Sequence, residues 1–361
     1  MYAVTNRNIE SGESGLAMFG ELPSAKGPNE LRLLRVEKSG KSWKVELLDD
    51  ELPESEVKAI ADEFSLVDFD TARKQYASFR VAADIFRRAR KQKRNVVFFV
   101  HGFNNNMQAV LERALDFEKN FGVEVIPFSW PANGGGVSGV LSYKSDKRDA
   151  KASVGALDRA LAKMNGYLRL FTESTRLSCF TKASKEFPDN PERRDARYAA
   201  LLEKSCPFTV NFLAHSMGNY LYKHLLLSTA SEGTELCFDN VILAAADANN
   251  KEHKLWVDRI ECRVRTYVTI NENDSALAAS RAKSGQDQLA RLGAYLGALD
   301  SQRAYYVNFT DAPWVRTAHA YFEGMALKNK AIEKFFNEAL NGRRAESDLN
   351  HDTAGNYYDF A

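Results

Sequence analysis

A serine at residue 216 stands between an apolar stretch and a helix-like stretch. The mainly apolar residues 210–213 lead into Ala214-His215-Ser216-Met217-Gly218, and apolar residues at helical spacing follow. This order predicts a strand, a sharp turn and a helix, with the Ser216 hydroxyl raised as a nucleophile. Strand and helix approach closely at such a turn, so the small residues Ala214 and Gly218 fit their positions. An inert serine in a tight turn is the alternative interpretation.

A second segment, His101-Gly102-Phe103, directly follows the apolar run 96–100. A loop at this place supplies one backbone N–H to an oxyanion hole, and the residue after the nucleophile supplies the other. We therefore predict Phe103 and Met217 as the donors. Gly102 lets the backbone approach a substrate carbonyl, and we expect His101 to organise the loop. By itself, the segment is also compatible with a plain glycine turn.

A general base must come from one of six histidines, which are His101, His215, His224, His253, His319 and His351. When the nucleophile lies on a strand–turn–helix of this kind, the acid follows the serine along the chain and the histidine follows the acid. His319 follows the last apolar run. The others are excluded by position: His101 precedes the serine and His215 adjoins it, His224 lies on the helix after it, His253 comes before the usual place of the acid, and His351 falls in the polar tail. Order and elimination therefore favour His319.

Two aspartates could orient that histidine. Asp247 ends the apolar run 240–246, and Asp274 follows the run 264–270. The acid fixes the tautomer of the base and stabilises its imidazolium form. We favour Asp274, which comes after the penultimate strand. Asp247 remains the alternative acid, or a carboxylate that lines the substrate pocket or caps a helix.

Alternating patterns position these residues. Short, continuously apolar runs are typical of strands covered on both faces, and amphipathic stretches lie between most of them. The sequence predicts an α/β fold with a mostly parallel central sheet and helices on both faces. The expected strands are 96–100, 123–128, 208–213, 240–246, 264–270 and 305–309, and the expected helices are 107–120, 146–170, 217–230, 275–293 and 324–340.

We expect one domain over residues 1–340. Its first part, 1–94, contains a strand at 2–5, a β-hairpin of 31–36 with 43–48, and a helix over 70–92. Residues 171–205 predict an inserted helical segment, with a lid as the alternative, and the glycine-rich stretch 131–144 predicts a flexible connection that could also cover the site. The polar tail, 341–361, is expected to be mobile, although Tyr357, Tyr358 and Phe360 could dock.

Composition excludes several classes of protein. A net charge of +1 gives no basis for binding nucleic acid or an anionic membrane. The four cysteines have no metal-ligand spacing, and we expect no metal and no cofactor. No apolar run approaches the roughly 20 residues that span a bilayer, and the first residues do not resemble a signal peptide. We expect a cytoplasmic enzyme.

Together these motifs resemble a bacterial α/β-hydrolase family of unknown function, with motifs like those of esterases and lipases. The match includes residues 2–7, 99–105, 128–131, Tyr143 with Asp146, 213–219, 246–247, 273–277 and 319–322. Ala214 is normal in that family, whereas Ala246 stands where the family usually has proline. The resemblance implies the α/β-hydrolase fold and a triad of Ser216, Asp274 and His319.

The expected reaction is hydrolysis of a carboxylic ester, from a small-molecule or lipid substrate, through an acyl-enzyme on Ser216. A thioesterase or an amidase would use the same triad. A non-catalytic binding protein with the same fold is the alternative from another class, because fold does not imply function.

Overall fold

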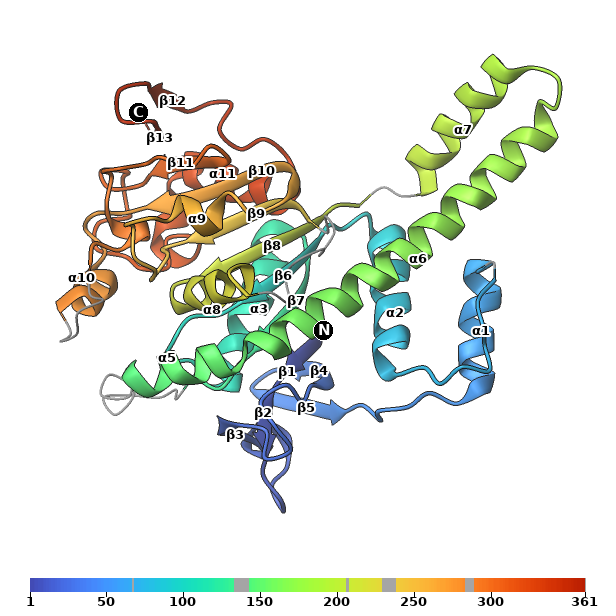
Figure 1. Ribbon diagram of the computed structural model, residues 1–361, viewed down its shortest axis with the longest axis horizontal. Helices are drawn as coiled ribbons and strands as arrows, with labels where there is room; N and C mark the ends of the chain where they lie inside the picture. Colours follow the sequence, from blue (N-terminus) through green and yellow to red (C-terminus); the bar gives the residue numbers. More distant parts are fainter. Residues whose placement is uncertain (67, 133–142, 206–207, 229–237, 283–288, 361) are drawn as a thin grey trace.

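The computed structural model describes residues 1–360 apart from residues 67, 133–142, 206–207, 229–237 and 283–288. Figure 1 shows a central sheet flanked by helices, with a pair of helices that projects from one side.

The central sheet contains eleven strands within the described part of the chain, in the order β12-β13-β11-β10-β9-β8-β6-β7-β1-β4-β5. In this order, all neighbouring strands between β13 and β1 pair in parallel. At one edge β4 pairs antiparallel with both β1 and β5, and at the other edge β12 pairs antiparallel with β13. The mostly parallel sheet is therefore confirmed. Its strands are β1 (Tyr2–Thr5), β4 (Arg32–Ser39), β5 (Ser42–Leu47), β6 (Val96–Val100), β7 (Glu124–Ser129), β8 (Val210–His215), β9 (Phe238–Ala244), β10 (Cys262–Ile270), β11 (Ala304–Asn308), β12 (Asn350–Asp352) and β13 (Tyr357–Asp359).

Helices cover both faces of this sheet, which explains the continuously apolar strands. Side chains alternate between the faces along each strand. In β6, Val96, Phe98 and Val100 pack in one core cluster with α2 (Ala77–Gln92), α6 (Val154–Glu186), α8 (Met217–Leu226) and α9 (Lys254–Val257). Val97 and Phe99 pack in the opposite cluster with α3 (Met107–Phe121) and α11 (Lys330–Leu340).

The N-terminal region contains the predicted hairpin, formed by β4 and β5. β1 pairs with β7 and thereby joins the hairpin to the parallel sheet. Three elements of this N-terminal region were not expected, because each is short or weakly patterned: α1 (Glu54–Phe64) and the separate ribbon of β2 (Arg7–Ile9) with β3 (Phe19–Pro23). The remaining elements are α5 (Tyr143–Ala152), α10 (Ser275–Ala282) and the 3-10 turns at Gly15–Met18, Leu292–Ala294 and Gly324–Lys328.

The expected insertion is a helical hairpin of the second half of α6 and α7 (Pro191–Ser205). α7 ends just before β8 begins, so it lies at the amino end of that strand, whereas Ser216 follows its carboxyl end. Figure 1 shows the hairpin extending away from the sheet. In this arrangement residues 171–205 do not lie over Ser216. For the stretch 131–144, most residues lie outside the described part of the chain. No described helix, α6 included, has the length and apolar character that a membrane span requires.

The tail differs from the expected mobile segment. β13 pairs in parallel with β11, and β12 folds back against β13. Apolar side chains hold it there: the Phe360 ring lies 4.6 Å from the ring of Phe309, centroid to centroid, and 6.0 Å from that of Phe335. In the sequence, only the three aromatic residues near the end of the chain indicated this docking. The polar residues around them favoured the interpretation as a mobile tail.

From this docking we predict that Phe360→Ala lowers the free energy of unfolding by about 2 kcal/mol. This loss is smaller than that of the same substitution at a fully buried position, because the Phe360 side chain is half-buried. Urea denaturation measures the change. Thr353→Ala, at an exposed position of the same tail, is the matched control and should change stability by less than about 0.5 kcal/mol. Equal stability of Phe360→Ala and wild type would show that the tail does not support the core.

Candidate active site

Ser216 lies at the junction of β8 and α8 in a strained backbone conformation, with φ 54° and ψ −122°. Left-handed φ is uncommon for a residue with a side chain and costs about 1–3 kcal/mol. Surrounding hydrogen bonds hold it: the Ser216 N–H donates to the Ala244 carbonyl, and its own carbonyl accepts from the Asp247 N–H. The buried Asn219 amide adds bonds to the carbonyls of Ala214, Ser216 and Ala244. The turn is thus fixed by β9 and the residues after it, and by Asn219 on the helix that follows.

The glycines of the two motifs permit close packing around this turn. A Cβ added to Gly218 would lie 2.6 Å from the carbonyl oxygen of Val100, so α8 starts against the end of β6. A Cβ added to Gly102 would lie 2.7 Å from Cβ of Ser216. The loop after β6 therefore lies directly against the serine, which is where the sequence placed it. Ala214 is fully buried.

His319 and Asp274 are hydrogen-bonded. The Nδ1–H of His319 donates to Oδ2 of Asp274 at 2.7 Å. The other carboxylate oxygen, Oδ1, accepts the N–H groups of Ala276 and Leu277 at the start of α10. Asp274 is fully buried, and these donors fix its orientation. A carboxylate held in this way fixes the histidine tautomer that leaves Nε2 as a proton acceptor.

Backbone contacts hold the loop that carries His319 against the loop that carries Asp274. The Asn271 side-chain amide donates to the carbonyls of Arg316 and Ala318, each at 3.0 Å. The Ser275 N–H donates to the carbonyl of Thr317. These bonds connect the ends of β10 and β11, so the histidine–carboxylate pair is built on two neighbouring parallel strands.

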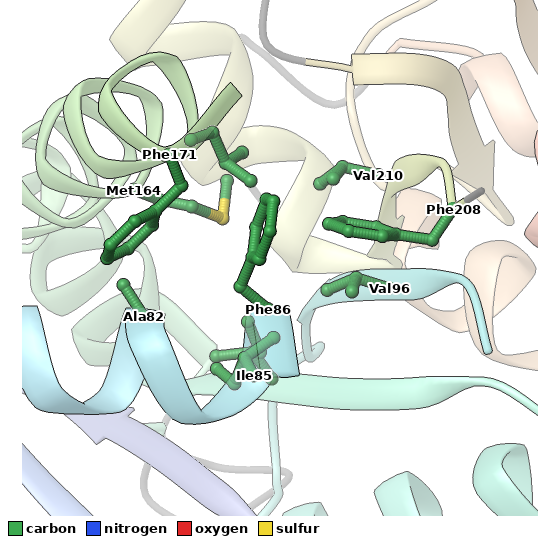
Figure 2. A pocket seen from close by; sticks show the side chains of 10 residues that line it. Ala82, Ile85, Phe86, Val96, Met164, Phe171, Phe208 and Val210 are labelled. Atoms are coloured by element: carbon green, nitrogen blue, oxygen red, sulfur yellow. The ribbon is translucent and has the colours of Figure 1, made fainter. Parts of the chain in front are cut away.

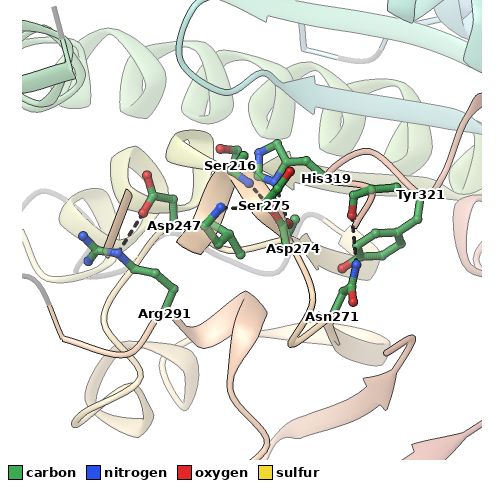
Figure 3. Close-up of polar contacts among 12 residues, drawn as sticks. Ser216, Asp247, Asn271, Asp274, Ser275, Arg291, His319 and Tyr321 are labelled. Atoms are coloured by element: carbon green, nitrogen blue, oxygen red, sulfur yellow. Dashed lines mark hydrogen bonds and ion pairs between the residues drawn. The ribbon is translucent and has the colours of Figure 1, made fainter. Parts of the chain in front are cut away.

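His215, beside the serine, supports His319 from the opposite side. Its Nε2–H donates to the His319 carbonyl at 3.2 Å, and the two rings lie 4.6 Å apart. Burial, then the neighbouring His319 and Arg113, holds the pKa of His215 well below its ordinary value, so its ring is neutral. Figure 3 shows His319 next to Ser216, with Asp274 below. Among the described contacts there is no hydrogen bond between Oγ of Ser216 and the His319 ring; such bonds are often long without a substrate.

His101 organises the loop before Phe103. Its Nδ1–H donates to the Gly102 carbonyl, and its Nε2 accepts the Trp130 N–H. Burial, then the charge of Arg7, lowers the pKa of His101 to about 3, so the ring is neutral and can accept that bond. The structure thus gives His101 contacts that organise the loop.

Arg7 contacts the same loop from the N-terminal ribbon. Its Nη2 donates to the Asn105 carbonyl at 2.6 Å, and its Nε donates to Oγ of Ser129. The Asn105 amide in turn donates to the carbonyl of Phe103 at 2.7 Å. The Gly102 carbonyl, which shares a peptide plane with the Phe103 N–H, accepts bonds from His101 and from the Asn105 amide, so the Phe103 N–H points away from these donors. The second predicted donor, the Met217 N–H, begins α8 and has no acceptor within its own helix.

Asp247 belongs to a different contact network. Its carboxylate forms an ion pair with Arg291 at 3.0 Å and accepts the Ser280 hydroxyl at 2.7 Å. Asp247 and Arg291 are both 2% exposed. Figure 3 places this pair on the side of Ser216 away from Asn271 and Tyr321. The structure therefore pairs Asp274, and not Asp247, with His319.

Four supporting residues were not identified from the sequence: Arg7, Asn219 and Asn271 had no assigned role, and His215 was considered only as a base. Arg7 and Asn271 act through backbone carbonyls distant in sequence, so no spacing rule reveals them. Asn219, three residues after the serine, carries a local signal, since a buried polar residue in an apolar helix needs backbone partners.

The remaining histidines have other contacts. His253 bonds to Tyr306 and the Asn250 carbonyl, His224 lies on α8, and the His351 ring packs on Tyr358. Within the described residues, no group of three or more histidine, cysteine, aspartate or glutamate side chains could hold a metal ion.

Comparison with family models gives one match, to the family described as "Alpha/beta hydrolase of unknown function (DUF900)", over residues 78–169 and 199–317. The match covers more than half of the chain and includes Ser216, Asp247 and Asp274 but ends just before His319. It omits most of the helical hairpin of α6 and α7. Neither the curated proteins nor the solved structures give a match.

The close approach at the turn predicts the effect of two matched substitutions. Gly218→Ala should lower the free energy of unfolding by about 1–3 kcal/mol, because the new methyl group meets backbone carbonyls that cannot move freely. Gly166→Ala, in α6 with open space around it, should raise stability by up to about 1 kcal/mol. Urea denaturation distinguishes them, and a neutral Gly218→Ala would contradict the packing described for the turn.

Proposed function

Because the chain belongs to the family of α/β hydrolases of unknown function, we propose that it is a serine hydrolase that cleaves a carboxylic ester through an acyl-enzyme on Ser216. One observation carries the proposal: a histidine hydrogen-bonded to a buried carboxylate lies beside a serine on a strained strand-to-helix turn. That combination supplies a nucleophile, a base and the group that orients the base.

In the proposed reaction, Nε2 of His319 takes the proton from Ser216 as Oγ attacks the ester carbonyl. Asp274 remains ionised and stabilises the imidazolium that forms. His319 then returns the proton to the leaving alkoxide, which leaves the acyl group on Ser216. A water molecule, deprotonated by the same imidazole, releases the acid and restores the serine.

The proposed oxyanion hole consists of the N–H groups of Phe103 and Met217. Two features support it: the loop after β6 lies against Ser216, and His101, Asn105 and Arg7 fix the carbonyls of that loop. Donors that are fixed before the reaction stabilise developing charge without reorganisation, and one such donor is typically worth about 10²–10³ in turnover. The positive charge of Arg7 lies behind the loop and favours the oxyanion further.

Short-chain p-nitrophenyl esters test the proposal, with parallel thioester and anilide substrates to define the bond that is cleaved. Wild type should hydrolyse the ester, and Ser216→Ala and His319→Ala should each lower kcat/KM by at least about 10³ with unchanged thermal stability. His351→Ala, in the tail, is the matched control and should retain full activity. Hydrolysis of the ester by Ser216→Ala at the wild-type rate would overturn the proposal.

A second test separates the two candidate acids. Asp274→Asn should lower kcat by about 10³–10⁴ with little loss of stability, because asparagine can still cap α10 but no longer fixes the productive tautomer. Asp247→Asn leaves Arg291 buried without its counter-charge and should lower stability by about 3–5 kcal/mol. Its folded fraction should keep kcat within tenfold of wild type. The reverse pattern would assign the acid role to Asp247.

A further inference from the structure

A cavity of about 560 Å³ lies between α2, α6 and the sheet, and none of its lining residues belongs to the site around Ser216. Its floor is apolar: Val4, Phe98 and Ile126 come from three neighbouring strands of the sheet. Volumes of this size are typical of ligand sites.

The two helices meet above this floor. The hydroxyls of Ser78 and Tyr167 lie 3.0 Å apart, and the Phe79 ring packs against the Tyr167 ring. On the inner side, Val81, Ala82 and Met164 line the cavity. The helices and the sheet therefore enclose a cleft with an apolar interior, and we call its polar end, lined by Tyr76, Ser78, Arg159 and Lys163, the mouth.

A smaller, fully apolar chamber of about 40 Å³ adjoins the cleft and shares four lining residues with it, Ala82, Ile85, Ile126 and Met164. Figure 2 shows Phe86, Phe171 and Phe208 around this chamber. Met164 stands between the two spaces, and its unbranched thioether side chain adapts readily to a neighbour. The apolar interior can therefore lengthen along the helices.

The lining changes from polar to apolar along both helices. At α2 the lining changes from Tyr76, the N-cap residue, and Ser78 to Ile85 and Phe86. Along α6 it changes from the cationic Arg159 and Lys163 to the apolar Leu168 and Phe171. Both helices thus present their polar end at the mouth. A ligand that matches this gradient has one polar head and one apolar chain.

Charge at the mouth indicates the sign of that head. On the β4–β5 side, Glu30 pairs with Arg32 and Glu51 pairs with Lys74, each at 2.5 Å. Asp49 and Asp50, also on that side, are exposed to solvent, and the Asp50 carboxylate lies 3.9 Å from the Arg32 guanidinium. Except for Asp49, the carboxylates of this side therefore have cations of their own.

On the α6 side, Arg159 and Lys163 follow each other at one turn of the helix, and within the described part of the chain no carboxylate lies at ion-pair distance from either. The Arg32 hydrogen bond, and more weakly the charge of Arg159, lower the pKa of Glu30 on the opposite side. The Arg159 guanidinium donates to the Asn29 carbonyl, and the Lys163 ammonium lies over the Tyr76 ring. Burial, then the like charges of Arg159 and Arg73, lowers the pKa of Lys163. An anion at this place would relieve that repulsion.

We propose that this cleft binds a single-chain aliphatic carboxylate, with its alkyl chain between α2, α6 and the sheet and its carboxylate on Lys163 and Arg159. The proposal does not depend on the hydrolase activity. It accounts for the apolar interior, for the polar mouth and for two cations with no carboxylate at ion-pair distance in the described part of the chain.

Isothermal titration calorimetry with dodecanoate, below its micelle concentration, tests the proposal on the full chain. Wild type should bind one equivalent, whereas butyrate, which has the head without the chain, and dodecyltrimethylammonium, which has the chain with the opposite charge, should bind at least tenfold more weakly. Lys163→Glu should weaken dodecanoate binding at least tenfold. Lys182→Glu, at an exposed position of the same helix, is the matched control and should not change it.

A cavity-filling substitution and its control test whether the ligand lies in this cleft. Ala82 lines both spaces, so Ala82→Phe should abolish dodecanoate binding, while Ala200→Phe, exposed on α7, should leave it unchanged. Circular dichroism and melting temperature establish that each variant is folded. No saturable binding to wild type, or equal binding by wild type and the folded Lys163→Glu and Ala82→Phe variants, would overturn the proposal.

Discussion

The backbone at Ser216 is the constraint on which the site depends. A residue with a side chain is held at positive φ, and the hydrogen bonds from Ala244, Asp247 and Asn219 offset the strain. These bonds require β9 to lie beside β8, and Gly218 must lie against the end of β6. The turn therefore exists only when three parallel strands are already in register, so the nucleophile candidate is a product of the sheet as a whole.

The partners of the serine come from the same sheet. β10 ends in the loop of Asp274 and β11 in the loop of His319, and Asn271 joins the two loops. Parallel strands place all of their carboxyl ends at one edge, which is how residues about a hundred positions apart meet. The cleft between α2 and α6 lies over other strands of the sheet, β1, β6 and β7, and uses a different part of the same scaffold.

The sequence predicted the fold well because the continuously apolar strands and the motif at 214–218 are local signals. It also predicted the pairing of His319 with Asp274, since chain order limits the choice. It did not predict β13, because pairing with β11 is decided by aromatic contacts with Phe309 and Phe335 that have no periodicity. Arg7 was missed for a related reason: its partners are carbonyls on distant segments.

The proposed role of Ser216 is that of a nucleophile activated by its surroundings, and labelling with a fluorophosphonate is the sharpest test of that role. The phosphonyl group reacts rapidly with an activated serine and very slowly with ordinary hydroxyl groups, and peptide mass spectrometry identifies the residue that carries it. We expect one adduct per chain, on Ser216, which forms in wild type and forms much more slowly in the folded His319→Ala variant. An unlabelled, folded wild type, or an adduct on another residue, would contradict it.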